Sequence, residues 1–416
     1  MSLHDAPKRL LKRLLASAII ALPLASCGGG STAIVSPPPP PPPPVVVTLS
    51  PATAAFTYAS GAANPAPASV TVASSGAAIT GLAIGTVTYG AGASGWLTAT
   101  LSGPSTPATL TLIASPAALA PGSYSATVPV TSSMTGVAAQ NLQVTLSVGQ
   151  APGVSVLIAG NIAQCGTTGD QATANLLDSL PGTVFTAGDN AFPQGSAANY
   201  HDCYDPSWGR FKSRTWATMG NHEYDQGNAN DAFAYFGDRA GPAGKGYYSM
   251  NIGSWHIIVL NDNRTFVEFM PGSEQSRWLS ADLAADTSRC TMAIWHQPLF
   301  YSSTSGATQG SDRKALWDTL YAYNADVIVN GHLHHYERMA PMAPSGTRDD
   351  GRGIREFNSG LGGASTLMPT TTQPNSQIIG TSFGVLQLTL RQGSYDWKFI
   401  PIAGETFTDS GTGTCH

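Results

Sequence analysis

The sequence predicts an α/β domain preceded by a small all-β sandwich domain, and three observations lead to this fold class. The charges are unevenly divided: no Asp, Glu, Lys or Arg occurs in the 156 residues between Arg13 and Asp170. Within that stretch, residues 45–148 form short runs with period-two alternation, separated by Gly, Pro, Ser and Ala, which is typical of a sandwich. From Val154 onward, short apolar runs alternate with helical segments, as in an α/β fold.

The overall composition excludes some classes of function. The 416 residues include 20 Lys or Arg and 25 Asp or Glu, which gives a formal net charge of −5. A nucleic-acid-binding protein needs clustered cations against the phosphates, so we expect no nucleic-acid-binding surface. The low charge also argues against charge-driven disorder, and the length suffices for two domains with a core each.

Residues 1–27 have the features of a lipoprotein signal peptide. Basic residues at positions 8–13 precede an apolar stretch of 11 residues at 14–24, which is too short to span a bilayer. The sequence Leu-Ala-Ser-Cys ending at Cys27 resembles the lipobox of bacterial lipoproteins, and a plain signal peptide is the alternative. The resemblance implies an exported protein with a lipid anchor at Cys27, on the periplasmic face or cell surface. Gly28 after the cysteine indicates the outer membrane if the cell is Gram-negative.

Residues 28–44 predict a Gly/Pro-rich linker. Eight consecutive prolines occupy positions 37–44, and such a run forms a stiff polyproline helix of roughly 25 Å. We expect this segment to act as a spacer between the anchor and the folded part.

Residues 45–150 predict a β-sandwich of the immunoglobulin-like kind. The stretches 95–97 and 119–128 resemble bacterial immunoglobulin-like accessory domains, including those called BACON. Some domains of that kind bind glycans, but the lack of charged residues in this stretch favours a spacer role, with contact to a glycan as the alternative.

The elements expected in residues 154–416 follow from apolar runs and helical periodicity. The run at 154–158 predicts a strand, and the helix that follows should end near Pro181-Gly182, a helix-stopping pair. The further elements are strands at 183–187, 255–260, 290–295 and 326–329, and helices at 170–180, 273–286 and 313–323.

Polar clusters repeatedly follow an apolar strand. In open α/β sheets, ligands bind at the carboxyl ends of the strands, so these clusters are candidate site residues. They are Gly-Asp-Asn at 188–190, Gly-Asn-His-Glu at 220–223, His-Gln-Pro at 296–298 and Gly-His-Leu-His-His-Tyr-Glu-Arg at 331–338.

The order of these motifs resembles the calcineurin-like metallophosphoesterase superfamily, near its purple-acid-phosphatase-like bacterial members. The resemblance covers residues 154–416 and implies a four-layer αββα sandwich. It further implies hydrolysis of phosphate esters, as a phosphomonoesterase or phosphodiesterase, by a metal-bound hydroxide. Two ions about 3.5–4 Å apart acidify a water and neutralise the phosphate oxygens. The implied cofactors are two divalent or trivalent ions of Fe, Zn or Mn, and the implied partner is a small phosphate ester.

The resemblance also implies a role for each matching residue. Asp189 would bridge the two ions, and His334 would belong to the first metal site. The remaining ligands of the second metal site would be Asn221, His296 and His332. His222 matches the family's general acid, which Glu223 would orient, whereas Glu337 and Arg338 would support the loop. His335 is expected to be a solvated residue or to support a ligand from behind.

Three positions depart from the family's pattern. Asn161 stands where the family has an aspartate ligand of the first metal, and Phe192 stands where purple acid phosphatases have a ligating tyrosine. Gln297 replaces a second histidine that is often found in close bacterial relatives. An amide attracts a cation less than a carboxylate does, so we expect a strong second site, a weak or empty first site with Asn161 as a neutral ligand, and a colourless protein. The alternative is a degenerate surface lipoprotein that binds metal or phosphate with little or no turnover.

Four cysteines remain once Cys27 is set aside, an even number that suits an oxidising compartment. They allow three pairings. The family resemblance favours Cys165 with Cys203 and Cys290 with Cys415.

Overall fold

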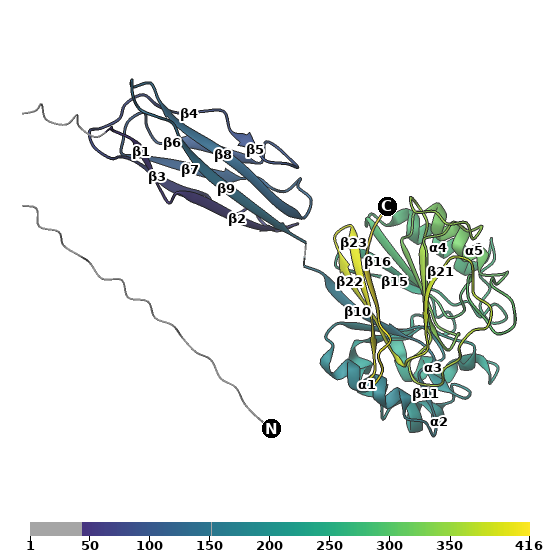
Figure 1. Ribbon diagram of the computed structural model, residues 1–416. Helices are drawn as coiled ribbons and strands as arrows, with labels where there is room; N and C mark the ends of the chain where they lie inside the picture. Colours follow the sequence, from purple (N-terminus) through teal and green to yellow (C-terminus); the bar gives the residue numbers. More distant parts are fainter. Residues whose placement is uncertain (1–43, 151) are drawn as a thin grey trace, which may run out of the picture.

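A computed structural model describes residues 44–150 and 152–416, which form an all-β sandwich followed by a larger α/β domain (Figure 1). The predicted signal peptide, lipobox and most of the linker lie outside the described residues. Among the residues that are described, no helix combines the length and the apolar character needed to span a bilayer.

The first domain packs two sheets against each other. One has the strand order β1-β3-β7-β6, and the other has the order β2-β9-β8-β4 with β5 paired to β8. Buried and exposed residues alternate along β9, which explains the period-two pattern of the sequence. The strands are β1 (Val47–Ser50), β2 (Thr53–Ala59), β3 (Ala68–Ser74), β4 (Leu82–Ile84), β5 (Thr88–Tyr89), β6 (Leu97–Leu101), β7 (Ala108–Ala114), β8 (Gly122–Ser132) and β9 (Gln140–Gly149).

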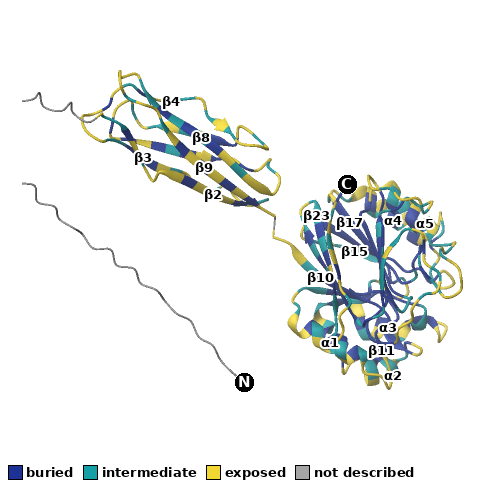
Figure 2. Cartoon of the chain, in the orientation of Figure 1, coloured by how far each residue is buried: buried dark blue, intermediate teal, exposed yellow. Residues whose placement is uncertain are grey.

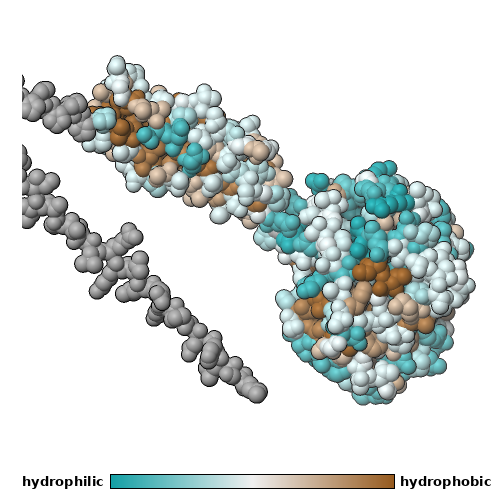
Figure 3. All heavy atoms as spheres, in the orientation of Figure 1, coloured by the Kyte–Doolittle hydropathy of each residue, from teal (hydrophilic) through white to brown (hydrophobic). Residues whose placement is uncertain are grey.

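The surface of this sandwich is neutral. No Asp, Glu, Lys or Arg occurs in residues 44–150, and most of the domain's face in Figure 3 has intermediate hydropathy. Figure 3 also shows apolar patches on this face, whereas the buried apolar residues form one core between the sheets, which includes Val70, Leu110, Val128 and Val144. The resemblance to BACON domains stays a prediction.

The second domain contains two larger sheets. The first sheet consists of β14 (Thr215–Trp216), β12 (Thr183–Thr186), β10 (Val154–Ala159), β22 (Gly384–Arg391), β23 (Ser394–Pro401) and β24 (Asp409–Thr414), in that order. The second sheet consists of β15 (Tyr248–Ile252), β16 (Trp255–Val259), β17 (Cys290–Ile294), β18 (Val327–Asn330), β20 (Arg355–Ser359), β19 (Tyr336–Met339) and β21 (Ser376–Gly380). A separate short pair is formed by β11 (Ala163–Gln164) and β13 (Ala191–Phe192).

Three hydrophobic cores divide this domain into four layers, which confirms the expected αββα sandwich. The central core lies between the sheets and joins Phe185 of the first to Trp255 of the second. A second core packs α1 and α3 on the outer face of the first sheet, and a third packs α4 and α5 on the outer face of the second. Figure 2 shows buried residues concentrated along the strands.

The helical segments match their sequence signals. Helix α4 begins after Ser273, whose side chain accepts a hydrogen bond from the backbone N–H of Ser276, as a capping residue does. All the elements expected from the sequence are found at their predicted places. The α-helices are α1 (Gly169–Ser179), α2 (Ala197–Asn199), α3 (Asn230–Phe236), α4 (Glu274–Ala285) and α5 (Lys314–Ala322). The other helical turns are η1 (Tyr200–Tyr204), η2 (Trp208–Arg214), η3 (His222–Tyr224) and η4 (Gly237–Ala240).

Parallel strands bring the polar loops of this domain together. Strands β10, β12 and β14 run parallel in the first sheet, and β16, β17, β18 and β20 run parallel in the second. Their carboxyl ends therefore point to the same edge of the sandwich, where loops that are distant in the sequence meet.

Two disulfides join Cys165 to Cys203 and Cys290 to Cys415. This is the pairing that the family resemblance implies, and it is confirmed. The second bridge fastens the carboxyl-terminal residues to the start of β17, 125 residues earlier, and closing such a long loop restricts the unfolded chain.

Candidate metal centre

The loops of the site contain unusual backbone conformations. Asn161, Asp189 and His332 have positive φ angles of 56°, 54° and 65°, and Asn324 is the one other non-glycine residue of this kind in the described chain. These three residues follow β10, β12 and β18. Such conformations are uncommon for residues with a side chain and are concentrated at functional sites.

The buried Asp189 and His296 form a cluster with the partly buried His332, with a ligand atom of each lying within 4.8 Å of the others. The Nε2 atom of His296 lies 2.9 Å from Oδ2 of Asp189, and Nδ1 of His332 lies 3.3 Å from the same nitrogen. The Nδ1–H of His296 donates to the carbonyl of Ala187 at 2.7 Å. That bond fixes the ring so that Nε2 faces the cluster, as is usual for metal-binding histidines.

Asn221 contributes a buried amide oxygen without a partner. Its Oδ1 accepts no hydrogen bond from the described residues, and an unsatisfied buried acceptor is costly. The residue lies beside Asp189, since the backbone N–H of His222 donates to Oδ1 of Asp189 at 2.9 Å. A Cβ at Gly220 would collide with Asp189, so glycine is needed for this approach of the two loops.

The pKa values of the cluster are set by the pairing of Asp189 with His296. Burial raises the pKa of Asp189, but His296 outweighs it and lowers the pKa to about 2. Burial lowers the pKa of His296, and Asp189 outweighs it and raises the pKa to about 9. Burial and the charge of His296 lower the pKa of His332 to about 3, which leaves that imidazole neutral. One carboxylate, one amide oxygen and two imidazoles are a donor set suited to Zn²⁺, Mn²⁺ or Fe²⁺.

Asn161 does not present the oxygen that a metal would need. Its Oδ1 accepts the backbone N–H of His332 at 2.7 Å, whereas its Nδ2 donates to the His332 carbonyl at 3.3 Å and to Nε2 of His334 at 2.9 Å. The reversed amide would place its NH₂ group against the N–H of His332. Asn161 therefore occupies the lone pair of His334 with a hydrogen bond. This geometry contradicts its predicted role as a neutral ligand of the first metal.

Phe192 fills part of the remaining space of the predicted first site. Its ring centroid lies 4.6 Å from that of His222 and 6.1 Å from that of His334. The Nδ1 of His334 is bonded to Ser365, at 2.6 Å from the hydroxyl and 3.2 Å from the carbonyl. Both ring nitrogens of His334 are therefore engaged in hydrogen bonds, with Asn161 on one side and Ser365 on the other.

The expectation that Glu223 orients the His222 ring is wrong. Glu223 is buried and accepts the backbone N–H groups of Asp189 at 3.0 Å, Asn190 at 2.8 Å and Gly220 at 2.6 Å. Its carboxylate therefore holds two loops together. The Nδ1–H of His222 is instead bonded to Asp225 and to the Pro193 carbonyl, both at 2.7 Å. Both acids follow His222 closely, and the sequence does not show which of them faces the ring.

The last motif supports the site from behind. His335 is buried rather than solvated, and its Nε2 lies 3.3 Å from Glu337. Glu337 accepts the backbone N–H of Ser302 at 2.9 Å and the hydroxyl of the same residue. Arg338 pairs with Asp409 at 2.7 Å. These residues fix the loops around the centre and contact none of the cluster's ligand atoms.

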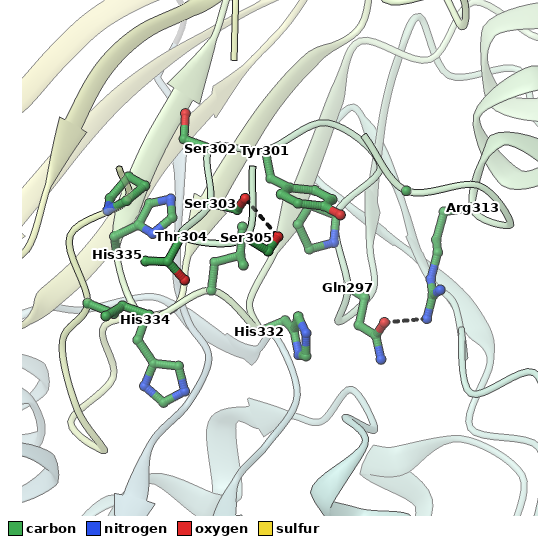
Figure 4. A pocket seen from close by; sticks show the side chains of 15 residues that line it. Gln297, Tyr301, Ser302, Ser303, Thr304, Ser305, Arg313, His332, His334 and His335 are labelled. Carbon is green, nitrogen blue, oxygen red and sulfur yellow. Dashed lines mark hydrogen bonds between the residues drawn. The ribbon is translucent and has the colours of Figure 1, made fainter. Parts of the chain in front are cut away.

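A cavity of about 310 Å³ opens beside His332 and His334. Figure 4 shows Gln297 and Arg313 on the side of His332, with a hydrogen bond between them. Arg313 belongs to no motif, and the sequence did not predict it as a site residue. A signal was nevertheless present, because it directly precedes the helix that follows a motif strand.

Comparison with known proteins gives the following matches. Residues 156–336 match the family model described as calcineurin-like phosphoesterase. Purple acid phosphatase 15 of Arabidopsis thaliana is 30% identical over 190 residues, which are 41% of this chain and 34% of that protein. Probable purple acid phosphatase 20 of the same plant is 29% identical over 225 residues, 47% of this chain and 52% of that protein. The chain thus spans between about a third and a half of the length of these relatives.

Among solved structures, purple acid phosphatase PPD1 from yellow lupin (Lupinus luteus) seeds is similar to this chain with a TM-score of 0.53 and 18% identity. The match covers 84% of this chain and 72% of that chain. At this identity the similarity concerns the fold.

Proposed function

We propose that this chain, which carries a calcineurin-like phosphoesterase domain with purple acid phosphatases among its relatives, hydrolyses phosphate esters at a metal centre. The ligands would be Asp189, Asn221, His296 and His332. The observation that carries the proposal is the unpartnered Oδ1 of Asn221 beside a buried cluster of one carboxylate and two imidazoles. A divalent ion held there would act as a Lewis acid toward a phosphate oxygen and lower the pKa of a bound water.

His222 would supply the proton for the leaving oxygen. Its Nδ1–H is held by Asp225 and Pro193, so the opposite nitrogen, Nε2, is oriented for proton transfer. The carboxylate of Asp225 accepts Nδ1–H at 2.7 Å and so fixes the direction of the ring. Phe192 packs against one face of the ring and limits its rotation.

The centre would hold one ion tightly, with the other position weak or empty. The amide of Asn161 donates to Nε2 of His334, which removes that imidazole as a ligand unless the bond breaks. A neutral amide also leaves Asp189 as the single carboxylate of the cluster. The absence of a tyrosine at position 192 supports the proposal of a colourless protein.

Metal content before and after Asn161→Asp tests this proposal. The aspartate cannot donate to His334 and adds a negative charge, so we expect about one equivalent of bound metal in the natural chain and about two in the variant. The measurement is elemental analysis after dialysis at fixed Zn²⁺ or Mn²⁺, followed by kcat/KM on a chromogenic phosphate ester. We expect kcat/KM to rise in the variant. Two equivalents in both proteins would contradict the single-ion proposal.

The second candidate is a metal- or phosphate-binding surface protein with little turnover, which the Asn161–His334 bond favours. His222→Ala separates the two candidates, because it removes the proton donor while the metal ligands stay in place. Loss of about 100-fold or more in kcat with unchanged metal content supports the enzyme. Equal rates in the variant and the natural chain support the second candidate.

The proposed location is outside the cytoplasm, with a lipid anchor at Cys27. The two disulfides support it, because such bonds persist in oxidising compartments. Contact of the β domain with a glycan also stays a proposal.

A further inference from the structure

We propose that the cavity beside the metal centre binds the organic part of the substrate, that this part is uncharged and largely apolar, and that Arg313 binds a phosphate oxygen. The inference rests on the proposed function, since it describes the substrate of the same site.

Arg313 is fixed to the loop that carries His296. Asp262 is 1% exposed and accepts the backbone N–H of His296 at 3.2 Å and that of Gln297 at 3.1 Å. The same carboxylate accepts Nε–H of Arg313 at 3.0 Å. The guanidinium is therefore positioned relative to the metal cluster before any substrate binds, which lowers the cost of binding.

The guanidinium of Arg313, which lines the cavity, keeps one nitrogen without a hydrogen bond to the described residues. Its Nη2 donates to the side-chain oxygen of Gln297 at 2.5 Å, whereas no hydrogen bond of Nη1 is found among the described residues. Arg313 and His332 line the same cavity (Figure 4). An arginine with a free N–H beside a metal cluster is suited to a phosphate oxygen, which it binds through a charge-assisted hydrogen bond.

The cavity contains no counter-ion for a cationic substrate group. Among the described residues that line it, there is no Asp or Glu, and Arg313 is the only Lys or Arg. The cavity on the other side of Arg313 differs, because its lining includes four carboxylates, Asp225, Asp262, Glu268 and Asp312. An ammonium group would lose its hydration in the first cavity without gaining a partner. A second anionic group would compete with the phosphate for Arg313.

One wall of the cavity is apolar and partly exposed. Tyr301, Leu333 and Leu367 line it, and the Leu367 residue is 53% exposed. Leu367 is held in place, since its backbone N–H donates to the carbonyl of His334 at 2.7 Å. Covering exposed apolar surface with a substrate group is favourable. The fitting class is thus a phosphate ester of an uncharged aromatic or aliphatic alcohol.

Binding to the metal-loaded full chain tests the assignment, with inorganic phosphate, 1-naphthyl phosphonate and phosphocholine as probes in calorimetry. Arg313→Ala should weaken the binding of inorganic phosphate and of the phosphonate alike, by about 10- to 100-fold. Leu367→Ser should weaken the binding of the phosphonate alone, by about fivefold. The natural chain should bind the phosphonate more tightly than phosphocholine.

Two neighbouring substitutions are matched controls. Arg264→Ala removes an arginine that is paired with Glu268 and Asp312 outside this cavity, and Met368→Ser removes an exposed side chain that does not line it. Both should leave the binding of all probes unchanged. Phosphocholine binding as tight as that of the phosphonate, or unchanged binding in both test variants, would overturn the inference. Phosphonate binding with this pattern but no hydrolysis of any ester would overturn the proposed function and leave the cavity assignment standing.

Discussion

At the scale of single residues, two buried side chains shape the proposed metal centre by bonding to the backbone. Asn161 binds both backbone groups of His332, and Glu223 binds the loops of Asp189 and Gly220. These bonds hold ligand loops that come from different strands. A change at either position should therefore alter metal binding without removing a ligand of the cluster.

Glu223→Gln is expected to lower both stability and metal affinity. One carboxylate oxygen accepts two backbone N–H groups, and the other accepts a backbone N–H and the Tyr200 hydroxyl. The amide NH₂ of glutamine must face one of these pairs of donors, at a cost of about 2–4 kcal/mol. Urea unfolding and a metal titration measure the two effects.

Glu268→Gln is the matched control for this prediction. Glu268 also accepts two backbone N–H groups, those of Phe269 and Met270, but its side chain is half exposed. Both N–H groups bond to the same oxygen, which the amide oxygen of glutamine can replace, so the unfolding midpoint should stay close to that of the natural chain. Equal effects of the two substitutions would show that the burial of Glu223 is unimportant.

At the scale of elements, Asp409 joins the two sheets of the α/β domain. It is buried at the start of β24, in the first sheet. It accepts bonds from Tyr336 and Arg338 of β19, in the second sheet, and from Trp397 of β23. Strand β19, which contains the end of the motif at 331–338, is thus held to the first sheet across the central core.

Asp409→Asn should destabilise the domain by about 2–3 kcal/mol at pH 7, because it leaves Arg338 without its charged partner. Burial raises the pKa of Asp409, but Arg338 outweighs it and the pKa lies below its usual 3.8. A lowered pKa in the folded state adds stability above the unfolded pKa, which is lost as the pH falls through the folded pKa. The difference in unfolding free energy between variant and natural chain should therefore shrink below about pH 4.

Denaturant unfolding between pH 7 and pH 3 measures that difference. Asp350→Asn is the control, since Asp350 forms an exposed pair with Arg348 and such pairs contribute little. A difference for Asp409→Asn that stays constant over this range would contradict the proposed charge effect.

At the scale of the whole molecule, the two domains have separate cores and different surfaces. The core of the sandwich lies within residues 45–148, whereas the cores of the α/β domain start at residue 156. Every residue of the metal cluster and its cavity belongs to the second domain. No described residue of the sandwich belongs to the cluster or lines the cavity.

A chain of residues 152–416 should therefore fold and keep kcat/KM within about twofold of the full chain, as an autonomous domain does. The measurements are thermal unfolding and hydrolysis of the same phosphate ester by both proteins. A cooperative unfolding transition with a tenfold loss of kcat/KM would show that the sandwich acts on the site.

The sequence by itself determined the order of the elements and the identity of most candidate ligands. Apolar runs predicted strands such as β10 and β17 because the side chains of a buried strand must be apolar on both faces. Motifs at strand ends predicted which residues would meet, because parallel strands place their carboxyl ends at one edge. Both are local properties of the chain.

Only the tertiary structure decided how individual atoms face one another. The amide orientation of Asn161 depends on His332, 171 residues away, and the position of Arg313 depends on Asp262, 51 residues away. Whether Glu223 or Asp225 contacts His222 depends on the turn of η3 and on the loop that carries Asp189. Spacing along the chain gives proximity, whereas the direction of a donor or acceptor depends on backbone angles and long-range partners.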